Sequence, residues 1–426
     1  MNSVSFRTKY AMSRINKSTL VERDNQINVS LKDSILRLLW REHQISRAEI
    51  SRQLDLSRST VTEIVRELLM TGLVAEVGIG KSSGGRKPIV LEFQDDAKVI
   101  LGIDIGATHV SVAMTNLRGK LLFWKEKEYP VREDSEGTHK VINELCNESL
   151  SSQNLDYDKL LSIGVSVPSP VDPIHPEYLS ESIIPAWHGK SGLERLREKY
   201  GVPVYLDNDA NLGALAENWW SAGKDVNDLI YIKISSGIGA GYILGGKLYR
   251  GSRGIAGEMS HMPIDPNGRL CGCGLRGCLA TVISAWALKE RVKTLATLYP
   301  GSSLVNIDPS IIDIEDAALD SDPLAIQVVS EATDYLTSAI TSLVNLMNPE
   351  MIIIGGSLSR LGELVLKPIR EKMEASALVS TITKTQLKTS ELGSKGIAIG
   401  AATLAIEQAF IDPKILRKNI VPAVIK

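Results

Sequence analysis

Apolar residues recur at helical spacing from Leu31 onward, and their pattern predicts three short helices. The first covers residues 31–43, where the apolar positions fall on one face of a helix. The second begins at Ser46, since a serine followed three positions later by a glutamate forms a capping box. The third begins at Ser57 and ends at Gly72. Three helices with a tight turn between the second and the third predict a helix-turn-helix.

Beyond the helices the pattern changes to two strands, at residues 73–77 and 88–93, joined by a glycine-rich segment over 78–87. Such a hairpin is the wing of a winged helix. Within it, Arg86 and Lys87 are expected to reach phosphates or the minor groove. The three helices alone are also compatible with a protein-binding bundle, and the basic wing disfavours that alternative.

The third helix is expected to enter the major groove, because its outward side chains near the N-terminal end are polar or cationic. These side chains are Arg58, Ser59, Thr60, Thr62 and Arg66. Residues 1–90 carry 15 lysines and arginines against 9 acidic residues, whereas the remainder carries 33 against 41. A basic front end on an acidic body favours contact with a polyanion.

The body begins with an apolar strand that turns at Gly106 and returns as a second strand. The glycine allows a phosphate to approach the backbone closely, and Thr108 offers a hydroxyl. Asp104 could hold a metal-bound water at the same turn. The alternative is a plain hairpin with a buried aspartate.

Further glycine-rich turns follow along the body, and a long amphipathic helix is predicted at residues 323–348. The turn positions are Ser236, Gly237, Gly239, Gly355 and Gly356. One such turn means little, but this order is similar to that of the actin and sugar-kinase nucleotide fold. We expect these positions to contact ATP and Mg²⁺ if nucleotide binding is retained.

The composition is that of a globular protein, with 43% hydrophobic and 23% charged residues in a chain of 426. This length predicts two to three domains. Residues 1–30 are polar and basic and are expected to form a flexible arm. Charges interrupt every apolar run there, and no later run approaches the roughly 20 residues of a membrane-spanning helix. We therefore expect a cytoplasmic protein without a membrane partner.

Three of the four cysteines lie close together, at Cys271, Cys273 and Cys278, and follow His261. Thiolates and a neutral imidazole can close a tetrahedral zinc site. The alternative is a disulfide knot, but Cys271 and Cys273 are too close to pair comfortably, and Cys146 is the fourth cysteine. Low cysteine usage elsewhere agrees with a reducing compartment. We expect a structural Zn²⁺ held by these four residues.

The chain resembles the ROK family (repressors, open reading frames and kinases) over essentially everything after residue 97. The motifs that carry the resemblance are DIGATH at 104–109, GVSVPSPVD at 164–172, LDNDAN at 206–211, SSGIGAG at 235–241, GIAGEMSH at 254–261, the cysteine cluster, and IIIGGSLS at 352–359. The family implies an α/β body of two lobes with the actin-like ATPase fold shared by sugar kinases and ribonuclease H. Its junction with a winged helix looks like the repressor branch, the xylose- and N-acetylglucosamine-type regulators.

The resemblance also implies a division of the chain into an arm, a winged helix-turn-helix and two lobes that close over a cleft. The second lobe would carry the zinc site and the dimerisation surface. The ranges are 1–30 for the arm, 31–95 for the winged helix-turn-helix, 98–215 with 396–426 for the first lobe, and 216–395 for the second lobe.

By resemblance, the sugar is held by Asn208, Asp209, Glu258 and His261. Asp209 would be the base that takes a proton from the sugar hydroxyl in the family's kinases. His261 would contact the sugar through one ring nitrogen and zinc through the other, so that the metal fixes its tautomer and aim. Taken alone, an Asn-Asp pair before a helix is more often a helix cap.

Four positions depart from the family pattern. Ala280 stands where the family has a sugar-binding glutamate, and losing a charged acceptor typically costs about 1.5–3 kcal/mol. Ser169 and Ser260 replace glycines, and His109 replaces a lysine that is common in the kinases. These departures weigh against phosphoryl transfer, while Asp209 and the zinc ligands are kept.

We therefore expect a sugar-responsive transcriptional regulator, most simply a repressor, with double-stranded operator DNA, a sugar or sugar phosphate, and a second copy of itself as partners. A dimer or tetramer would bind half-sites about one helical turn, or a multiple of it, apart. One alternative is an ATP-dependent sugar kinase with an appended DNA-binding domain. Another is a regulator whose sugar site has decayed.

Overall fold

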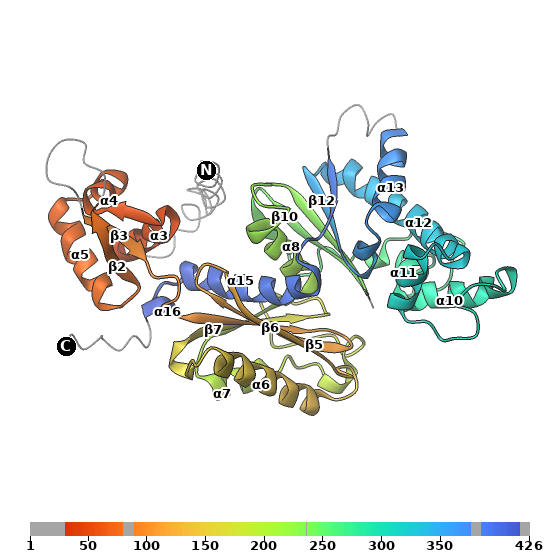
Figure 1. Ribbon diagram of the computed structural model, residues 1–426, viewed down its shortest axis with the longest axis horizontal. Coiled ribbons are helices and arrows are strands. Elements are labelled where there is room, and N and C mark those ends of the chain that lie inside the picture. The colour runs from red at the N-terminus through yellow and green to blue at the C-terminus, as the bar shows by residue number, and fades with distance from the viewer. Residues whose placement is uncertain (1–29, 80–88, 236, 376–384, 418–426) are drawn as a thin grey trace.

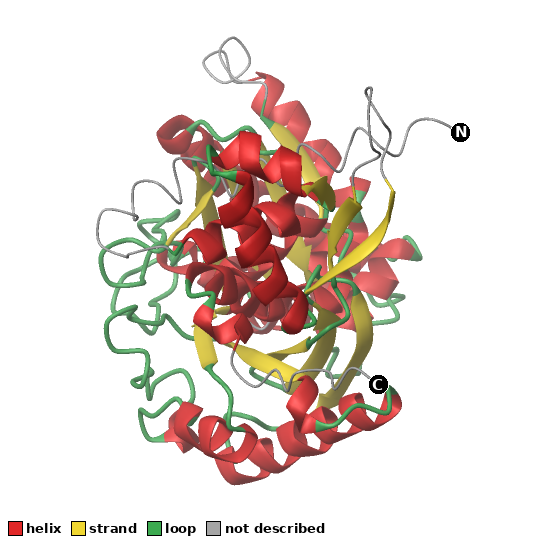
Figure 2. Ribbon diagram, turned by 90° about the vertical axis from the view of Figure 1, so that its left-hand side faces the viewer, coloured by secondary structure: helices red, strands yellow, loops and turns green. Residues whose placement is uncertain are grey.

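The computed structural model describes residues 30–79, 89–235, 237–375 and 385–417. A small N-terminal head lies at one end of the long axis, and two α/β lobes form the body (Figure 1). Figure 2 is seen from the end at which the head lies. The basic arm expected over 1–30 falls outside the described residues, apart from Ser30. Within the described residues, no helix is long and apolar enough to cross a membrane.

The head is a winged helix in which a three-stranded sheet, ordered β1-β3-β2, accompanies three helices. Its elements are α3 (Leu31–Glu42), β1 (Gln44–Ser46), α4 (Arg47–Leu54), α5 (Arg58–Met70), β2 (Val74–Ile79) and β3 (Ile89–Phe93). Serines cap all three helices, because the hydroxyls of Ser30, Ser46 and Ser57 accept from backbone amides in the first turns. The predicted helices are present. Strand β1 was not predicted, since a strand of this length leaves no periodic signal.

The first lobe is built on a five-stranded sheet in the order β6-β5-β4-β7-β8. Its strands are β4 (Val99–Ile105), β5 (His109–Asn116), β6 (Leu121–Glu128), β7 (Leu160–Val167) and β8 (Val204–Asn208). Helices α6 (Ser135–Ser152) and α7 (Leu193–Tyr200) lie on one side of this sheet, and α15 (Gly396–Ile411) lies on the other (Figure 1). A Cβ on Gly164 would come within 1.7 Å of the Ala401 carbonyl oxygen, so this glycine lets α15 rest directly on β7.

The second lobe repeats the same strand pattern in the order β11-β10-β9-β12-β13. Its strands are β9 (Leu229–Ile234), β10 (Ile238–Leu244), β11 (Lys247–Tyr249), β12 (Met351–Gly356) and β13 (Gln386–Thr389). Its helices are α9 (Ala280–Ile283), α10 (Ala285–Leu295), α11 (Ile311–Leu319), α12 (Pro323–Met347) and α13 (Glu363–Ala375). In each sheet three antiparallel strands are followed by two parallel strands. This duplicated pattern is the expected two-lobed actin-like fold.

Helices α8 (Asp209–Trp220) and α15 lie between the two sheets (Figure 1). Helix α15 is buried along most of its length. This agrees with its sequence, which consists mostly of alanine, isoleucine and other apolar residues. Helix α8 packs on α15 and also on β9 and β10 of the second lobe. The division expected between residues 215 and 216 therefore lies inside a helix that touches both lobes.

Candidate functional site

The histidine and cysteines predicted to bind zinc come together in the second lobe. One donor atom from each of His261, Cys271, Cys273 and Cys278 lies within 4.8 Å of the others. The Cys273 and Cys278 Sγ atoms are 3.5 Å apart, and His261 Nδ1 lies 3.6 Å from Cys271 Sγ. A tetrahedral ion with Zn–S bonds near 2.3 Å separates two sulfurs by about 3.8 Å, so the donor set fits zinc.

Backbone pairing holds this loop in place. Pro263 forms an isolated bridge with Cys278, and Leu270 forms one with Arg276. The Cys271 amide also donates to the Leu275 carbonyl at 2.7 Å. The short 3₁₀ helix Met259–His261 then places the histidine beside the cysteines. Since Nδ1 faces the cysteines, the other ring nitrogen, Nε2, is directed away from the metal position.

Asn208 and Asp209 lie where β8 meets the N-terminus of α8. The Asn208 Oδ1 accepts from the Ala210 amide at 2.9 Å, so it caps the helix. Its Nδ2 donates to the Ser169 carbonyl at 3.3 Å. Oδ1 of Asp209 accepts from the Ala210 amide at 2.7 Å. Both of these side chains are thus oriented by the first turn of α8, which is the position expected for a sugar contact.

Asp209 also forms a buried ion pair. The Lys233 ammonium on β9 donates to Oδ2 of Asp209 at 2.5 Å, and Lys233 is only 9% exposed. Burial alone would lower the pKa of Lys233, but the charges of Asp209 and Asp104 hold it above its ordinary value. A cation from the second lobe is therefore paired with the carboxylate that the family resemblance led us to expect as a base.

A second ion pair lies at the first glycine turn. Nε2 of His109 is 3.1 Å from Oδ2 of Asp104, and Asp104 is 1% exposed. Burial would raise the pKa of Asp104, but the hydrogen bond and charge of His109, with Lys233, keep it below its ordinary value. Burial would lower the pKa of His109, and Asp104 raises it instead. Because a Cβ on Gly106 would lie 2.3 Å from the His109 ring, the imidazole itself covers this turn.

Glu258 immediately precedes the 3₁₀ helix that carries His261. Its pKa is raised by burial and then by the charge of Asp209, so the two carboxyl groups face the same region. His261 is exposed, whereas Asp209 is buried. Ala280 begins α9 two residues after the last cysteine, and its side chain offers no acceptor there. Of the expected sugar contacts, Glu258 and Asp209 therefore lie near each other, and His261 follows Glu258 by three residues beside the cysteine loop.

The other positions expected at a nucleotide differ in exposure. Thr108, Gly237 and Gly356 are exposed, Gly239 is half-buried, and Gly355 is buried. Gly237 lies between β9 and β10, Gly239 is the second residue of β10, and Gly355 and Gly356 end β12. Ser236 lies outside the described residues. The glycine turns are therefore at the strand ends, as predicted, but His109 and Lys233 bring cations to the carboxylates beside them.

The candidate DNA surface is the N-terminal part of α5. Arg58, Thr62 and Arg66 follow one another at four-residue spacing, so they share one side of the helix, and all three are exposed. Ser59 is exposed as well, while Thr60 is half-buried and bonds the Ser57 hydroxyl at 2.8 Å. Arg86 and Lys87 fall in the segment 80–88, outside the described residues.

Sequence reasoning missed Lys233 and Arg250. Lys233 is the one charged residue of a strand that is otherwise apolar, Leu229–Ile234, and an isolated charge in a buried strand signals a buried partner. Arg250 donates from Nε to Oδ2 of Asp207 at 2.6 Å and so links the second lobe to the end of β8. Both partners come from distant parts of the chain, which spacing along the sequence cannot reveal.

Two protein-family models match the chain. A protein-family model described as ROK family matches residues 100–408, and a winged helix-turn-helix DNA-binding model matches residues 34–75. The xylose repressor of Caldicellulosiruptor bescii is 31% identical over 399 residues, which cover 91% of this chain and 98% of that protein. The DNA-binding transcriptional dual regulator NagC of Escherichia coli is 30% identical over 391 residues, covering 90% and 94%.

Two solved structures extend the comparison. A ROK family transcriptional regulator, described as a homologue of the E. coli MLC protein, superposes with a TM-score of 0.77 at 28% identity and covers 91% of this chain and 98% of its own. A ROK family glucokinase from Streptomyces griseus, in complex with glucose and AMPPNP, gives a TM-score of 0.62 at 28% identity and covers 72% and 98%. The chain therefore belongs to the ROK family and carries a winged helix-turn-helix DNA-binding domain ahead of the ROK body.

Proposed function

We propose that this protein is a cytoplasmic transcriptional repressor that binds operator DNA through its head and a sugar or sugar phosphate through its body. The observation that carries the proposal is the presence of both halves in one chain: an exposed cationic stripe on α5, and Asn208 and Asp209 at the first turn of α8. Relatives that span at least nine-tenths of the chain are named xylose repressor and DNA-binding transcriptional dual regulator NagC, which supports this function.

The DNA contacts that we propose are on α5 and in the wing. Arg58, Ser59, Thr60, Thr62 and Arg66 would contact the major groove, and Arg86 and Lys87 the adjacent backbone or minor groove. A helix-turn-helix of this kind usually acts as a pair, so we also propose a homodimer, or a dimer of dimers, on a roughly palindromic operator.

In the body we propose that Asn208, Asp209, Glu258 and His261 hold the effector. An amide and carboxylates suit sugar hydroxyls, because the amide can donate to or accept from one hydroxyl while each carboxylate accepts from another. Zn²⁺ on His261 and the three cysteines would fix the direction of the imidazole through the ring nitrogen that it ligates. The metal would therefore act on effector binding rather than on DNA contact.

The contacts of Asp209 favour a regulator over a sugar kinase. A general base must offer an oxygen to the attacking hydroxyl, and both oxygens of Asp209 already accept hydrogen bonds, Oδ1 from the Ala210 amide and Oδ2 from the Lys233 ammonium. Incubation with ATP, Mg²⁺ and a panel of hexoses should release no ADP beyond the background of the Asp209→Asn variant. Turnover that this variant abolishes would establish the kinase instead.

The proposal is tested by calorimetry and by DNA binding. Zinc-loaded protein is titrated with monosaccharides and their 6-phosphates, including xylose and N-acetylglucosamine, and operator affinity is then measured with and without each compound that binds. We expect at least one compound to bind and to shift operator affinity. Protein without DNA affinity in low salt contradicts the first half of the proposal, and DNA affinity that no sugar changes contradicts the second.

A further inference from the structure

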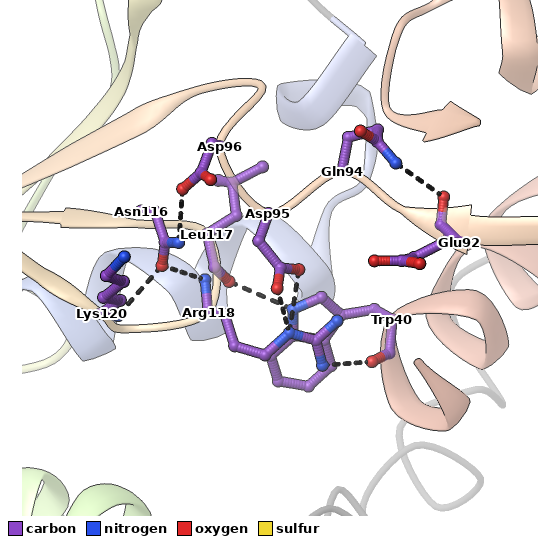
Figure 3. A network of polar contacts seen from close by, with 9 residues as sticks. All are labelled: Trp40, Glu92, Gln94, Asp95, Asp96, Asn116, Leu117, Arg118 and Lys120. Atoms are coloured by element: carbon purple, nitrogen blue, oxygen red, sulfur yellow. Dashed lines mark hydrogen bonds and ion pairs between the residues drawn. The ribbon is translucent and has the colours of Figure 1, made fainter. Parts of the chain in front are cut away.

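The head is attached to the first lobe through a buried tryptophan. Trp40, in the last turns of α3, is 2% exposed, and its indole Nε1 donates to the Leu117 carbonyl oxygen at 3.1 Å (Figure 3). Leu117 directly follows β5 of the body. The tryptophan of the DNA-binding domain is therefore bonded to a backbone group of the ROK body, not only to its own domain.

Arg118, in the turn after β5, contacts the same tryptophan. Its Nε lies 2.9 Å from each carboxylate oxygen of Asp95, in the segment between head and body, and one terminal nitrogen donates to the Trp40 carbonyl at 2.6 Å (Figure 3). The guanidinium carbon also stands 5.3 Å from the centre of the Trp40 ring. Its side chain is 12% exposed, so these contacts are weakly screened by water. One arginine thus binds the head, the connecting segment and the body together.

Neighbouring groups hold the connecting segment in the same place. Nδ2 of Asn116 donates to Oδ1 of Asp96 at 2.7 Å, and Oδ1 of Asn116 accepts from the Arg118 and Lys120 amides (Figure 3). The short linker between β3 and β4 is therefore fixed to the body, because Asp96 is bonded to the last residue of β5 and Asp95 to the turn that follows it.

The end of α15 packs against the same tryptophan. The rings of Phe410 and Trp40 have centroids 4.5 Å apart, and Phe410 also lies 6.1 Å from Phe93 of the wing sheet. Arg37, one turn before Trp40 in α3, donates to the Phe410 carbonyl at 2.9 Å and to the Ile411 carbonyl at 3.2 Å. These carbonyls end a helix, so the head supplies the donors that the last turn of α15 lacks.

Helix α15 in turn connects this joint with the proposed sugar contacts. It packs along α8, and a Cβ on Gly400 would lie 1.9 Å from the Leu212 carbonyl oxygen. Leu212 is one turn into the helix that begins at Asp209. The first turn of α8, the body of α15 and Trp40 of the head are therefore in continuous contact.

We infer that Arg118 and Trp40 form a clamp that holds the DNA-reading head rigidly on the first lobe, and that this clamp passes effector-driven lobe motion to α5. A rigid joint converts a rotation of the lobe into a displacement of the head, whereas a flexible tether would average it away. The inference rests on the proposed sugar-responsive function. Arg118 is on this view a positioning residue, because its role is to hold Trp40 and Asp95 in place.

The test compares full-length Arg118→Ala with a matched control, Arg195→Ala. Arg195 is an arginine of the same lobe whose ion pair with Glu136 is on the surface. Small-angle X-ray scattering first measures whether the head stays docked in each zinc-loaded protein. We expect the radius of gyration to increase for Arg118→Ala and to be unchanged for Arg195→Ala. An unchanged radius of gyration for Arg118→Ala would show that its head stays docked and would contradict the proposed clamp.

The second measurement is the ratio of operator affinity without and with N-acetylglucosamine 6-phosphate or xylose, whichever shifts the wild type. Arg118→Ala should reduce this ratio by about 2- to 30-fold while calorimetry shows the same affinity for the sugar. An unchanged ratio would overturn the inference. If no compound shifts the wild type, the proposed function fails, and scattering alone decides on the docking.

Trp40→Phe keeps the inference testable if Arg118→Ala does not fold. It preserves an aromatic ring against Phe410 and removes the indole donor to Leu117. We expect Trp40→Phe to reduce the ratio of operator affinities by less than Arg118→Ala does, again with unchanged sugar affinity. A variant that loses sugar affinity and DNA response in parallel would indicate a general loss of structure and would contradict a positioning role.

Discussion

The ammonium nitrogen of Lys233 lies 2.5 Å from Oδ2 of Asp209, and this ion pair joins β9 of the second lobe to the first turn of α8. Both side chains are nearly excluded from water. The pair therefore connects the two halves of the body at the carboxylate that the family resemblance led us to expect as a base.

Replacing Lys233 should destabilise the body strongly. Lys233→Met leaves Asp209 without its cation, and breaking one side of a buried pair typically costs about 3–5 kcal/mol. The exposed pair of Lys125 with Glu148 offers the control, since Lys125→Met should change the free energy of unfolding by less than about 1 kcal/mol. Urea unfolding of both variants measures the difference. Equal stability of the two would mean that the Lys233 pair contributes nothing.

The contact of His109 with Asp104 should make stability depend on pH. Folding raises the pKa of His109, so its contribution is complete below the ordinary value of 6.5 and is lost as the pH rises through the folded value. Folding lowers the pKa of Asp104, so its contribution is present above 3.8 and is lost as the pH falls through the folded value. The wild type should therefore be more stable than His109→Gln by the largest margin between pH 3.8 and pH 6.5, the ordinary pKa values of Asp104 and His109.

Denaturant unfolding of wild type and His109→Gln at several pH values checks this expectation. His175→Gln is the control, because His175 is paired with Glu177 on the surface. A stability difference between wild type and His109→Gln that is constant from pH 5 to pH 8 would contradict the assigned ion pair.

Removing zinc should weaken the effector response before it affects the head. The four donors lie in the second lobe, whereas α5 belongs to the head (Figure 1). Chelator treatment, or Cys273→Ser, should reduce the sugar-dependent change in operator affinity while the DNA affinity of the sugar-free protein stays unchanged. Metal content is measured by atomic emission, with Cys146→Ala as the control outside the cluster. An undiminished sugar response in metal-free protein would contradict the role that we propose for zinc.

Two arginine variants should separate base reading from phosphate contact. Arg58→Ala should lose about 1–3 kcal/mol of operator binding and relax sequence specificity. Arg86→Ala should weaken binding evenly across sequences and reduce the slope of affinity against salt by about 1. Titrations on operator and unrelated DNA at several salt concentrations, with Arg52→Ala on α4 as the control, measure both effects. Identical behaviour of the first two variants would mean that α5 is not the recognition helix.

Periodicity and local motifs were sufficient to predict the elements. The serine caps, the helical spacing of apolar residues and the glycine turns are short-range features, so the three helices of the head, the helix at 323–347 and the turns after β4 and β9 could be predicted from neighbouring residues. The cysteine cluster could be predicted for the same reason, because three of its ligands lie in one loop.

Contacts between distant segments were decided only by the tertiary structure. Lys233 meets Asp209, and Arg118 meets both Trp40 and Asp95, through packing of elements that sequence spacing does not relate. The sequence by itself determined the kind of protein, since family motifs and helix signals are local. Which cation pairs with Asp209, and how firmly the head is held, depended on the tertiary fold, because burial and ion pairing exist only once distant strands and helices are brought together.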